Sequence, residues 1–255
     1  MSLEPAGDTP AAPRPEGPRL QRFAPEVWIA AGDTVPFLTV PFPTRMTVVR
    51  LPDGALFVHS PERLDDTLRR ELAALGEVRH LVSPNKLHHL FLAEWLAAYP
   101  EASSHAAPGL PEKRPDLRFD TLLGDRPEPP WAPVMDQLVF RGSRAMEEVV
   151  FFHRPTRTLL LTDLVENFEP DSLGPLHRLV ARAAGILAPD GKTPVDWRLS
   201  FLLGRATARR CLERMLEWAP ERVILAHGRC IRHDGTGFLR RSFRWLLPDH
   251  PHSRR

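Results

Sequence analysis

Two adjacent histidines stand where a strand-like run of the chain gives way to a helix-like one. His88 and His89 belong to the segment 83–95, SPNKLHHLFLAEW, which directly follows the apolar run 78–82. A strand that ends in such a loop and then enters an amphipathic helix can aim ligands at one point, so this segment is our candidate site. Neighbouring side chains of an extended chain point to opposite sides. The two rings therefore converge only if the loop turns between them or if one ring lies on the first helical turn.

The elements that must position this segment can be read from the residues around it. Residues 60–63, Ser-Pro-Glu-Arg, predict a helix start with serine as N-cap, and leucines 64, 68, 72 and 75 supply its buried face. Gly76 ends that helix, and the run 78–82 predicts a buried strand of a parallel or mixed sheet. A further helix is expected over 87–98.

The rest of the chain shows strands followed by helices, twice over. In the first half, strands are expected at 27–31, 37–40, 46–51 and 56–59. In the second half, strands are expected at 134–141, 147–152, 158–162 and 223–226, and helices at 172–184, 205–218 and 236–247. The proline-rich region 101–133 between the halves predicts a surface loop that could wall or cover a site. This order indicates two β-rich halves with helices outside them.

Length and composition bound the organisation. The chain has 255 residues, of which 42% are hydrophobic, so it is long enough to bury a full core as one domain. We expect a disordered tail at 1–20, a single domain at 21–248 and a frayed tail at 249–255. The net charge is only +2, and 31 of the 34 basic residues are arginine, which disfavours nucleic acid as a partner.

Cysteine usage and hydropathy suggest the compartment. The two cysteines, Cys211 and Cys230, form no CxxC motif, which favours a reducing cytoplasm. No uninterrupted apolar run approaches 18 residues, and the first 20 residues lack the apolar core of a signal peptide. We therefore expect a soluble, cytoplasmic protein with no membrane partner. The oligomeric state cannot be derived from these features.

Four short segments, taken in order, resemble the metallo-β-lactamase-like superfamily. They are 54–59 (GALFVH), 81–89 (LVSPNKLHH), 158–163 (TLLLTD) and 223–228 (VILAHG). More closely, they are similar to an uncharacterised branch of that superfamily that is known only as a domain of unknown function. The resemblance covers 23–247 and implies an α/β fold, a four-layer αββα sandwich with metal ligands on loops along one edge of the two sheets.

The superfamily motif THxHxDH can be laid over 83–89. Pro84 and Lys86 then take the places of two histidine ligands, and a further expected histidine near 140–143 is missing, which dismantles one of the two metal positions. The resemblance leaves the other position with four ligands, which are His88, His89, Asp163 and His227.

Three imidazoles and a carboxylate suit one divalent metal ion, zinc or iron. Such an ion lowers the pKa of bound water to near 7 from about 16 and so makes hydroxide available at neutral pH. Asp163 would be the catalytic residue that positions the water and accepts its proton. Lys86 would bind an anionic group of the substrate beside the dismantled position, and His59 and His153 would support the ligands from behind.

Each of these residues also has a structural interpretation. The histidine pair can be hydrogen-bonded to backbone at a helix start, Asp163 can cap a helix or turn, and His227 can simply end a strand. His59 can cap a helix, while Lys86 and His153 can be solvated.

Three functions follow from these alternatives. The first is hydrolysis of an ester, thioester, lactone or phosphoester with a single metal ion and a small-molecule substrate. The second is a non-catalytic binding or regulatory module that descends from such an enzyme. The third, a surface that binds nucleic acid, is disfavoured by the low net charge.

Overall fold

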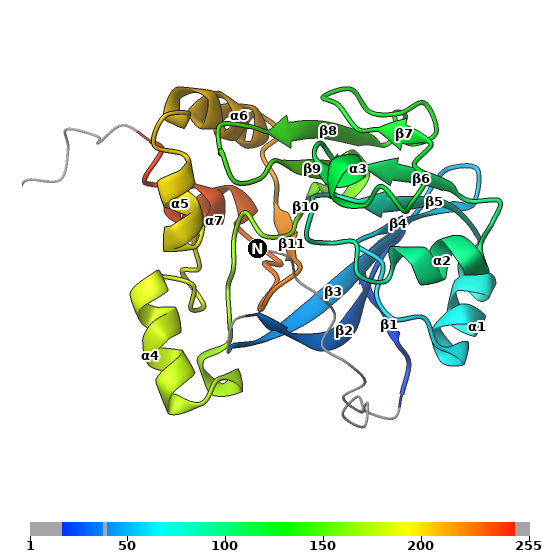
Figure 1. Cartoon of the computed structure of the whole chain (residues 1–255), viewed down its shortest axis with the longest axis horizontal. Coiled ribbons are helices and arrows are strands. Elements are labelled where there is room, and N and C mark those ends of the chain that lie inside the picture. The colour runs from blue at the N-terminus through cyan, green and yellow to red at the C-terminus, as the bar shows by residue number, and fades with distance from the viewer. Residues whose placement is uncertain (1–16, 38–39, 248–255) are drawn as a thin grey trace, which may run out of the picture.

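Two β-sheets face each other, and helices cover both outer faces (Figure 1). The structure is a computed structural model that describes residues 17–37 and 40–247. The first sheet has the order β1-β2-β3-β4-β5-β6-β7 and the second the order β11-β10-β9-β8. The strands of the first sheet are β1 (Leu20–Ala24), β2 (Val27–Phe37), β3 (Val40–Arg50), β4 (Ala55–His59), β5 (Glu77–Ser83), β6 (Ser103–Ala106) and β7 (Thr121–Leu122). Those of the second are β8 (Met135–Phe140), β9 (Glu148–His153), β10 (Thr158–Leu161) and β11 (Arg222–Leu225).

Strand direction sets which strand ends meet. In the first sheet, β1 to β4 are antiparallel neighbours, and β4 to β7 are parallel. In the second sheet, β8, β9 and β10 are antiparallel, and β10 and β11 are parallel. The carboxyl ends of parallel neighbours lie at the same edge of a sheet, which is where loops from several strands can build one site.

The helices are distributed over the two outer faces (Figure 1). They are α1 (Asp66–Leu75), α2 (Leu92–Ala98), α3 (Leu110–Lys113), α4 (Pro175–Ala184), α5 (Val195–Ser200), α6 (Arg205–Glu217) and α7 (Gly235–Ser242), with short 3₁₀ turns at Arg154–Thr156 and Pro170–Ser172. Leu68 and Leu72 of α1 pack with Trp95 of α2 on the outer face of the first sheet. On the second sheet, α6 buries four side chains at helical spacing, which are Ala208, Cys211, Leu212 and Met215.

A central core fills the space between the sheets. Phe57 of β4 and Phe151 of β9 meet there with ring centroids 5.2 Å apart, and Trp131 packs against Phe57. The neighbours of Phe57 along β4, Leu56 and Val58, point the other way, toward α1 and α2. Each fully buried side chain of this size contributes about 1.5–3 kcal/mol to stability. The layers are helix, sheet, sheet and helix, so the predicted αββα sandwich is confirmed.

Several local predictions need correction. The first helix begins at Asp66 rather than at Ser60, because the Asp65 carboxylate accepts the N–H of Leu68 and caps it, while Ser60 has φ of 55°. The second helix begins at Leu92 rather than residue 87, and turns fill the segment before it. The region 101–133 is not a surface loop throughout, since it contains β6 and the fully buried Trp131.

Other predictions fall at the limits of the described chain. The strand expected at 37–40 includes residues 38 and 39, which lie outside the described residues. So do residues 1–16 and 249–255 of the expected tails and residue 248 of the expected domain. In the described ranges, no helix has the length and apolar character needed to cross a bilayer.

Candidate metal centre

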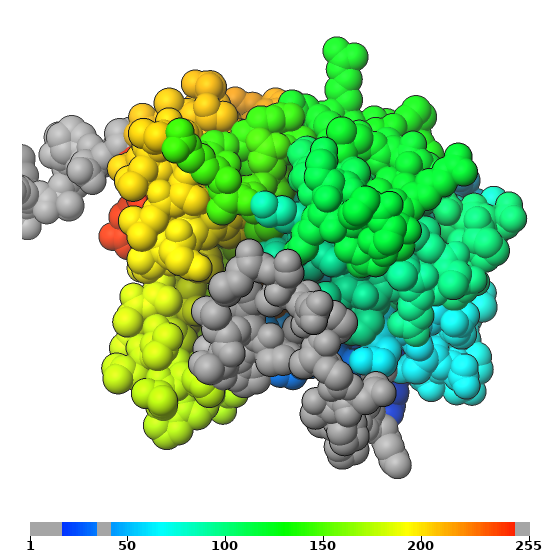
Figure 2. Space-filling view, in the orientation of Figure 1, coloured from blue at the N-terminus to red at the C-terminus, as the bar shows by residue number. Residues whose placement is uncertain are grey.

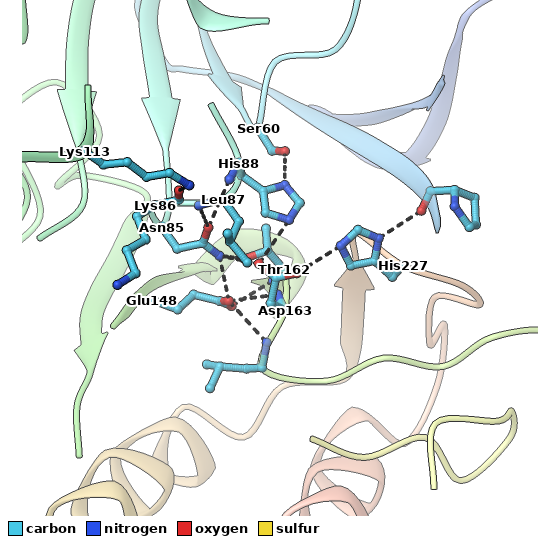
Figure 3. A network of polar contacts seen from close by, with 12 residues as sticks. Ser60, Asn85, Lys86, Leu87, His88, Lys113, Glu148, Thr162, Asp163 and His227 are labelled. Atoms are coloured by element: carbon cyan, nitrogen blue, oxygen red, sulfur yellow. Dashed lines mark hydrogen bonds and ion pairs between the residues drawn. The ribbon is translucent and has the colours of Figure 1, made fainter. Parts of the chain in front are cut away.

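Three of the predicted ligands come together at one edge of the two sheets (Figure 3). Asp163 follows β10 and His227 follows β11, so the parallel pairing of these strands places both side chains at the same edge. His88 comes from the turns after β5 of the other sheet. One ligand atom from each residue lies within 4.8 Å of the others, and among the described residues this is the group that could hold a metal ion.

The carboxylate of Asp163 lies between the two imidazoles. His227 Nε2 is 3.0 Å from Asp163 Oδ1, and His88 Nε2 is 3.3 Å from Asp163 Oδ2. All three side chains are at most 11% exposed. Both histidines thus present the same nitrogen, Nε2, to one shared carboxylate in a largely dehydrated environment.

The other nitrogen of each ring is held from outside the cluster. His227 Nδ1 donates to the carbonyl oxygen of Pro43 at 2.9 Å, and His88 Nδ1 is 2.6 Å from the hydroxyl of Ser60. A hydrogen bond at Nδ1 fixes the orientation of an imidazole and leaves Nε2 directed at the centre, which is the usual arrangement of histidines that bind metals. Phe42 also packs edge-on against the His227 ring.

Asn85 connects the cluster to its surroundings (Figure 3). Its amide nitrogen donates to Asp163 Oδ2 at 2.7 Å, to Thr162 Oγ1 at 2.9 Å and to Glu148 Oε2 at 3.2 Å. Its amide oxygen accepts the backbone N–H groups of Leu87 and His88. The amide therefore fixes both the Asp163 carboxylate and the turn that carries His88.

A second buried carboxylate lies behind Asp163. Glu148 is fully buried and accepts the backbone N–H groups of Thr162, Asp163 and Leu164 at 2.8, 2.8 and 3.2 Å. Burial and the nearby charge of Asp163 raise the pKa of Glu148. This residue holds the loop after β10 in place and was not among the predicted site residues.

The electrostatics favour charged forms in the cluster itself. Burial alone would raise the pKa of Asp163, but the charge of His88 and the hydrogen bonds from His227 and His88 outweigh it and hold the pKa well below its usual range. Burial likewise lowers the pKa of His227, but the hydrogen bond and charge of Asp163 raise it to about 9. In contrast, burial raises the pKa of Glu62 and of Glu166 to about 8, so these neighbours add little negative charge at neutral pH.

A family model matches most of the part of the chain that carries this site. The model, described as a domain of unknown function (DUF4336), matches residues 26–175, which is more than half of the 255 residues. The chain belongs to the DUF4336 family. No curated protein matches its sequence.

Solved structures place this DUF4336 chain in a larger structural group. The metallo-β-lactamase DIM-1 aligns with a TM-score of 0.61 and 14% identity over 89% of this chain and 95% of that enzyme. A metallo-β-lactamase from Hirschia baltica gives 0.60 and 12% over 91% and 98%. The metallo-β-lactamase FIM-1 from Pseudomonas aeruginosa, in its mono-zinc form, gives 0.60 and 9% over 94% and 98%. The DUF4336 chain therefore has the metallo-β-lactamase-like fold, with low sequence identity to these enzymes.

The fourth predicted ligand lies apart from the cluster. His89 Nδ1 accepts a hydrogen bond from the Arg114 guanidinium at 3.0 Å, and burial together with Lys113 and Arg114 lowers its pKa to about 4. The turn between the two adjacent histidines does not bring their rings to one point. The predicted set of four ligands is thus reduced to three in the DUF4336 structure.

The predicted supporting histidines have different positions. His59 is buried at the end of β4 and packs edge-on against Phe151, and burial together with the charge of His88 lowers its pKa to about 3. His153 is not beside the site. His153 ends β9, and its Nδ1 is 2.8 Å from the Thr156 hydroxyl. Glu148, at the start of the same strand, is the residue that contacts the Asp163 loop.

Lys86 takes part in the site region through its backbone. Its carbonyl oxygen accepts a hydrogen bond from the Lys113 ammonium at 2.8 Å. In Figure 3, the Lys86 side chain extends away from His88 and His227. Its predicted contact with substrate stays a prediction.

Three supporting residues of the DUF4336 site were missed from the sequence, namely Ser60, Asn85 and Glu148. Ser60 was predicted to be a helix cap, and Asn85, between Pro84 and Lys86, was assigned no function. The position of Glu148 next to Asp163 could have been predicted from the pairing of the two strands of the hairpin. The register of the β9–β10 hairpin pairs Thr158 with His153, and its continuation brings Glu148 opposite Asp163.

Proposed function

We propose that this DUF4336 protein binds one divalent metal ion through His88, Asp163 and His227 and is a metal-dependent hydrolase of an ester, thioester, lactone or phosphoester. The observation that carries the proposal is the convergence of two Nε2 atoms on one carboxylate, with each Nδ1 atom held from outside. The metallo-β-lactamase-like fold supports the same reading, because a His/Asp cluster lies at the loop edge of its sheets.

The donor set fits such an ion. Two imidazoles and one carboxylate form the set of three protein ligands found in catalytic zinc sites and in non-haem iron sites, and both leave a position open for water or substrate. The Nδ1 hydrogen bonds of His88 and His227 provide the orientation that such ligands need. A metal held there would act as a Lewis acid and would lower the pKa of a bound water molecule to about 7, so that hydroxide is available at neutral pH.

The residues of the chain would orient the reacting groups. Asp163 is ionised at neutral pH because its neighbours hold its pKa low, so its carboxylate can hold a cation and orient a water molecule by accepting a hydrogen bond from it. The Asn85 amide prevents that carboxylate from rotating, and Glu148 fixes the backbone on either side of it. Low exposure of the cluster keeps bulk water from competing for the same groups.

A non-catalytic binding or regulatory module is the second candidate function. It is favoured by the closure of the cluster, since both Asp163 oxygens already have partners and the Asp163 side chain is 11% exposed. The superfamily positions at Pro84 and Lys86 carry no histidine, and Asn85 between them donates to Asp163 and Glu148. In such a module, the metal or the hydrogen-bond network would have a structural purpose and no turnover would be seen.

Metal analysis and turnover assays separate the two functions. For the hydrolase, protein purified without added metal should carry close to one equivalent of zinc, iron or manganese and should hydrolyse at least one member of an ester, lactone, thioester and phosphoester panel. His227→Ala should abolish both, while His233→Ala, at a histidine with an 84% exposed side chain, should change neither. Less than about a tenth of an equivalent, with no uptake of added metal, would overturn metal binding. A full equivalent with no turnover on the panel would favour the binding module.

A further inference from the structure

One buried amide nitrogen in the candidate metal centre is surrounded by more oxygen atoms than it can satisfy. The nitrogen is Nδ2 of Asn85, a residue that is fully buried. The oxygen atoms around it are Asp163 Oδ2 at 2.7 Å, Thr162 Oγ1 at 2.9 Å and Glu148 Oε2 at 3.2 Å. A primary amide carries two hydrogen atoms, so it cannot give each of three acceptors a hydrogen bond of its own. The place that this nitrogen fills is therefore lined with oxygen and short of positive charge.

The orientation of the Asn85 amide is fixed by its other end. Its Oδ1 accepts the backbone N–H groups of Leu87 at 2.8 Å and of His88 at 3.0 Å. Donors on one side and acceptors on the other leave one way to place the amide, with its nitrogen toward the carboxylates. Asn85 follows β5 of the first sheet, whereas the three oxygen atoms belong to β9 and to the loop after β10. The nitrogen therefore lies between the two β-rich halves, which are in contact on the face shown in Figure 2.

Two of the three oxygen atoms belong to carboxylates that are removed from water. Glu148 is fully buried, and the Asp163 side chain is 11% exposed. Asp163 pairs with the rings of His88 and His227, but no ion pair within the described residues involves Glu148. The partners of Glu148 are backbone N–H groups and the Asn85 amide, all of them donors, as an ionised carboxyl group needs. Two like charges near one buried point repel, so this place favours a positively charged group.

Ions that prefer oxygen ligands bind in surroundings of this composition. Carboxylate and hydroxyl oxygens suit manganese, magnesium and calcium. No lysine or arginine of the described chain pairs with Glu148 or Asp163, although Lys86 is the next residue after Asn85. In Figure 3, the Asn85 amide alone points between the two carboxylates. A neutral amide thus stands at a point whose oxygen atoms could hold a cation.

We propose that the Asn85 amide takes the place of a second cation, so that the centre holds one metal ion and no more. A second ion would have to displace an amide that belongs to the chain and is held at both ends. The inference deepens the proposed function and rests on that function for the first ion only. It makes residue 85 the position that sets the number of ions, because a carboxylate there would complete a cage of oxygen ligands with Glu148, Thr162 and Asp163.

Counting bound Mn²⁺ by equilibrium dialysis tests the proposal on the full chain. Wild-type protein should saturate at one equivalent and stay there when the concentration of the ion is raised about tenfold. Asn85→Asp keeps the shape of the side chain and the oxygen that caps the turn, but puts an oxygen atom where the amide nitrogen was. This variant should bind two equivalents, and Mn²⁺ should raise its melting temperature by at least about 5 °C more than that of the wild type.

A double variant separates this inference from the proposed function. His227→Ala removes a ligand of the first ion and should bind no Mn²⁺, whereas His227→Ala/Asn85→Asp should bind one equivalent at the new place. The readout is the equivalent gained by the change at position 85, so it does not depend on turnover of any substrate. Wild-type protein that binds no ion would contradict the proposed function, while a gain of one equivalent in Asn85→Asp would still support the present inference.

Asn167→Asp is the matched control, because Asn167 is also fully buried but its amide meets backbone groups only. Its Nδ2 donates to the carbonyl oxygen of Arg229 at 2.8 Å, and its Oδ1 accepts the N–H of Gly191 at 3.1 Å. This variant should lose stability without gaining an ion. A folded Asn85→Asp protein that binds no more Mn²⁺ than the wild type would overturn the proposal. So would a second ion in the wild type that is lost in Glu148→Gln, a measurement that decides the matter even where Asn85→Asp does not fold.

Discussion

Two pairs of histidines in this protein have nearly the same ring geometry and very different surroundings. The rings of His88 and His227 have centroids 5.3 Å apart at an interplanar angle of 49°, and those of His80 and His105 are 5.3 Å apart at 50°. In the first pair, the Asp163 carboxylate bonds to both rings. In the second pair, His80 Nδ1 and His105 Nε2 are 3.2 Å apart and bond to each other.

The groups around each pair decide what it can do. Trp131 packs edge-on against both rings of the His80 pair, and burial together with the charge of His80 lowers the pKa of His105 to about 4. Both imidazoles of that pair are therefore neutral near pH 7, and both contact the fully buried Trp131. The His88 pair instead has a shared anion and Nδ1 atoms held by Ser60 and Pro43. Closeness of two imidazoles is therefore not enough for a metal site, which also needs a carboxylate and fixed ring orientations.

The largest expected effect is on metal affinity when the shared anion is removed. Asp163→Asn keeps the size of the side chain but removes its charge, so affinity for zinc should fall by more than about a hundredfold. The measurement is a competition titration with a chelating dye. His105→Gln, in the other pair, should leave the affinity unchanged. Equal loss in both variants would show that the two pairs do not differ as described.

A smaller effect is expected when one ring loses its outer hydrogen bond. Ser60→Ala leaves all three ligands in place but frees the Nδ1 atom of His88, so metal affinity should fall by roughly 10- to 100-fold. The same titration measures it. Ser83→Ala is the matched control, because the Ser83 hydroxyl is buried and lacks a hydrogen-bond partner within the described part of the chain. Unchanged affinity in Ser60→Ala would contradict a positioning function for this hydroxyl.

The smallest expected effect concerns acid stability and the His80 pair. Burial holds His105 neutral with a pKa of about 4, whereas the unfolded chain takes up the proton near pH 6.5. The unfolded state thus binds more protons between these values, so stability is lost as the pH falls through that window. The titration of this residue should lower the free energy of unfolding by about 2 kcal/mol on going from about pH 7 to about pH 5.

Urea unfolding of His105→Gln checks this expectation. The variant is expected to be less stable than the wild type near neutral pH, where its bond to His80 is lost. The gap between the two should narrow at about pH 5, because glutamine does not titrate. His233→Gln should unfold in parallel with the wild type at both pH values. A gap for His105→Gln that stays constant or widens in acid would show that His105 is charged in the folded state.

The sequence was informative where a residue's position along the chain sets its place in space. Asp163 and His227 follow short apolar runs, and such runs became neighbouring parallel strands whose ends meet. His88 was found for the same reason. The four-layer fold followed from two successions of strands and helices together with the resemblance, and the solved structures bear it out.

The misses share a physical cause, which is that side-chain direction depends on turns and pairings that a single sequence does not specify. His89 differs from His88 by one position and points to Arg114 instead. His153 ends a strand whose other end faces the site, and only the antiparallel direction of β9 decides which end that is. The four-residue strand β6 is too short and polar to stand out in a proline-rich region.

The hydrogen bonds of Asn85 also bear on the order in which the protein folds. They join residues 63 and 78 positions apart, and the bond from His227 to Pro43 spans 184 positions. Contacts that close such long loops form late, because the chain must first bring distant segments together. The centre is therefore incomplete until β11 has docked beside β10. Capture of an ion would then coincide with the last stage of folding and would not guide its beginning.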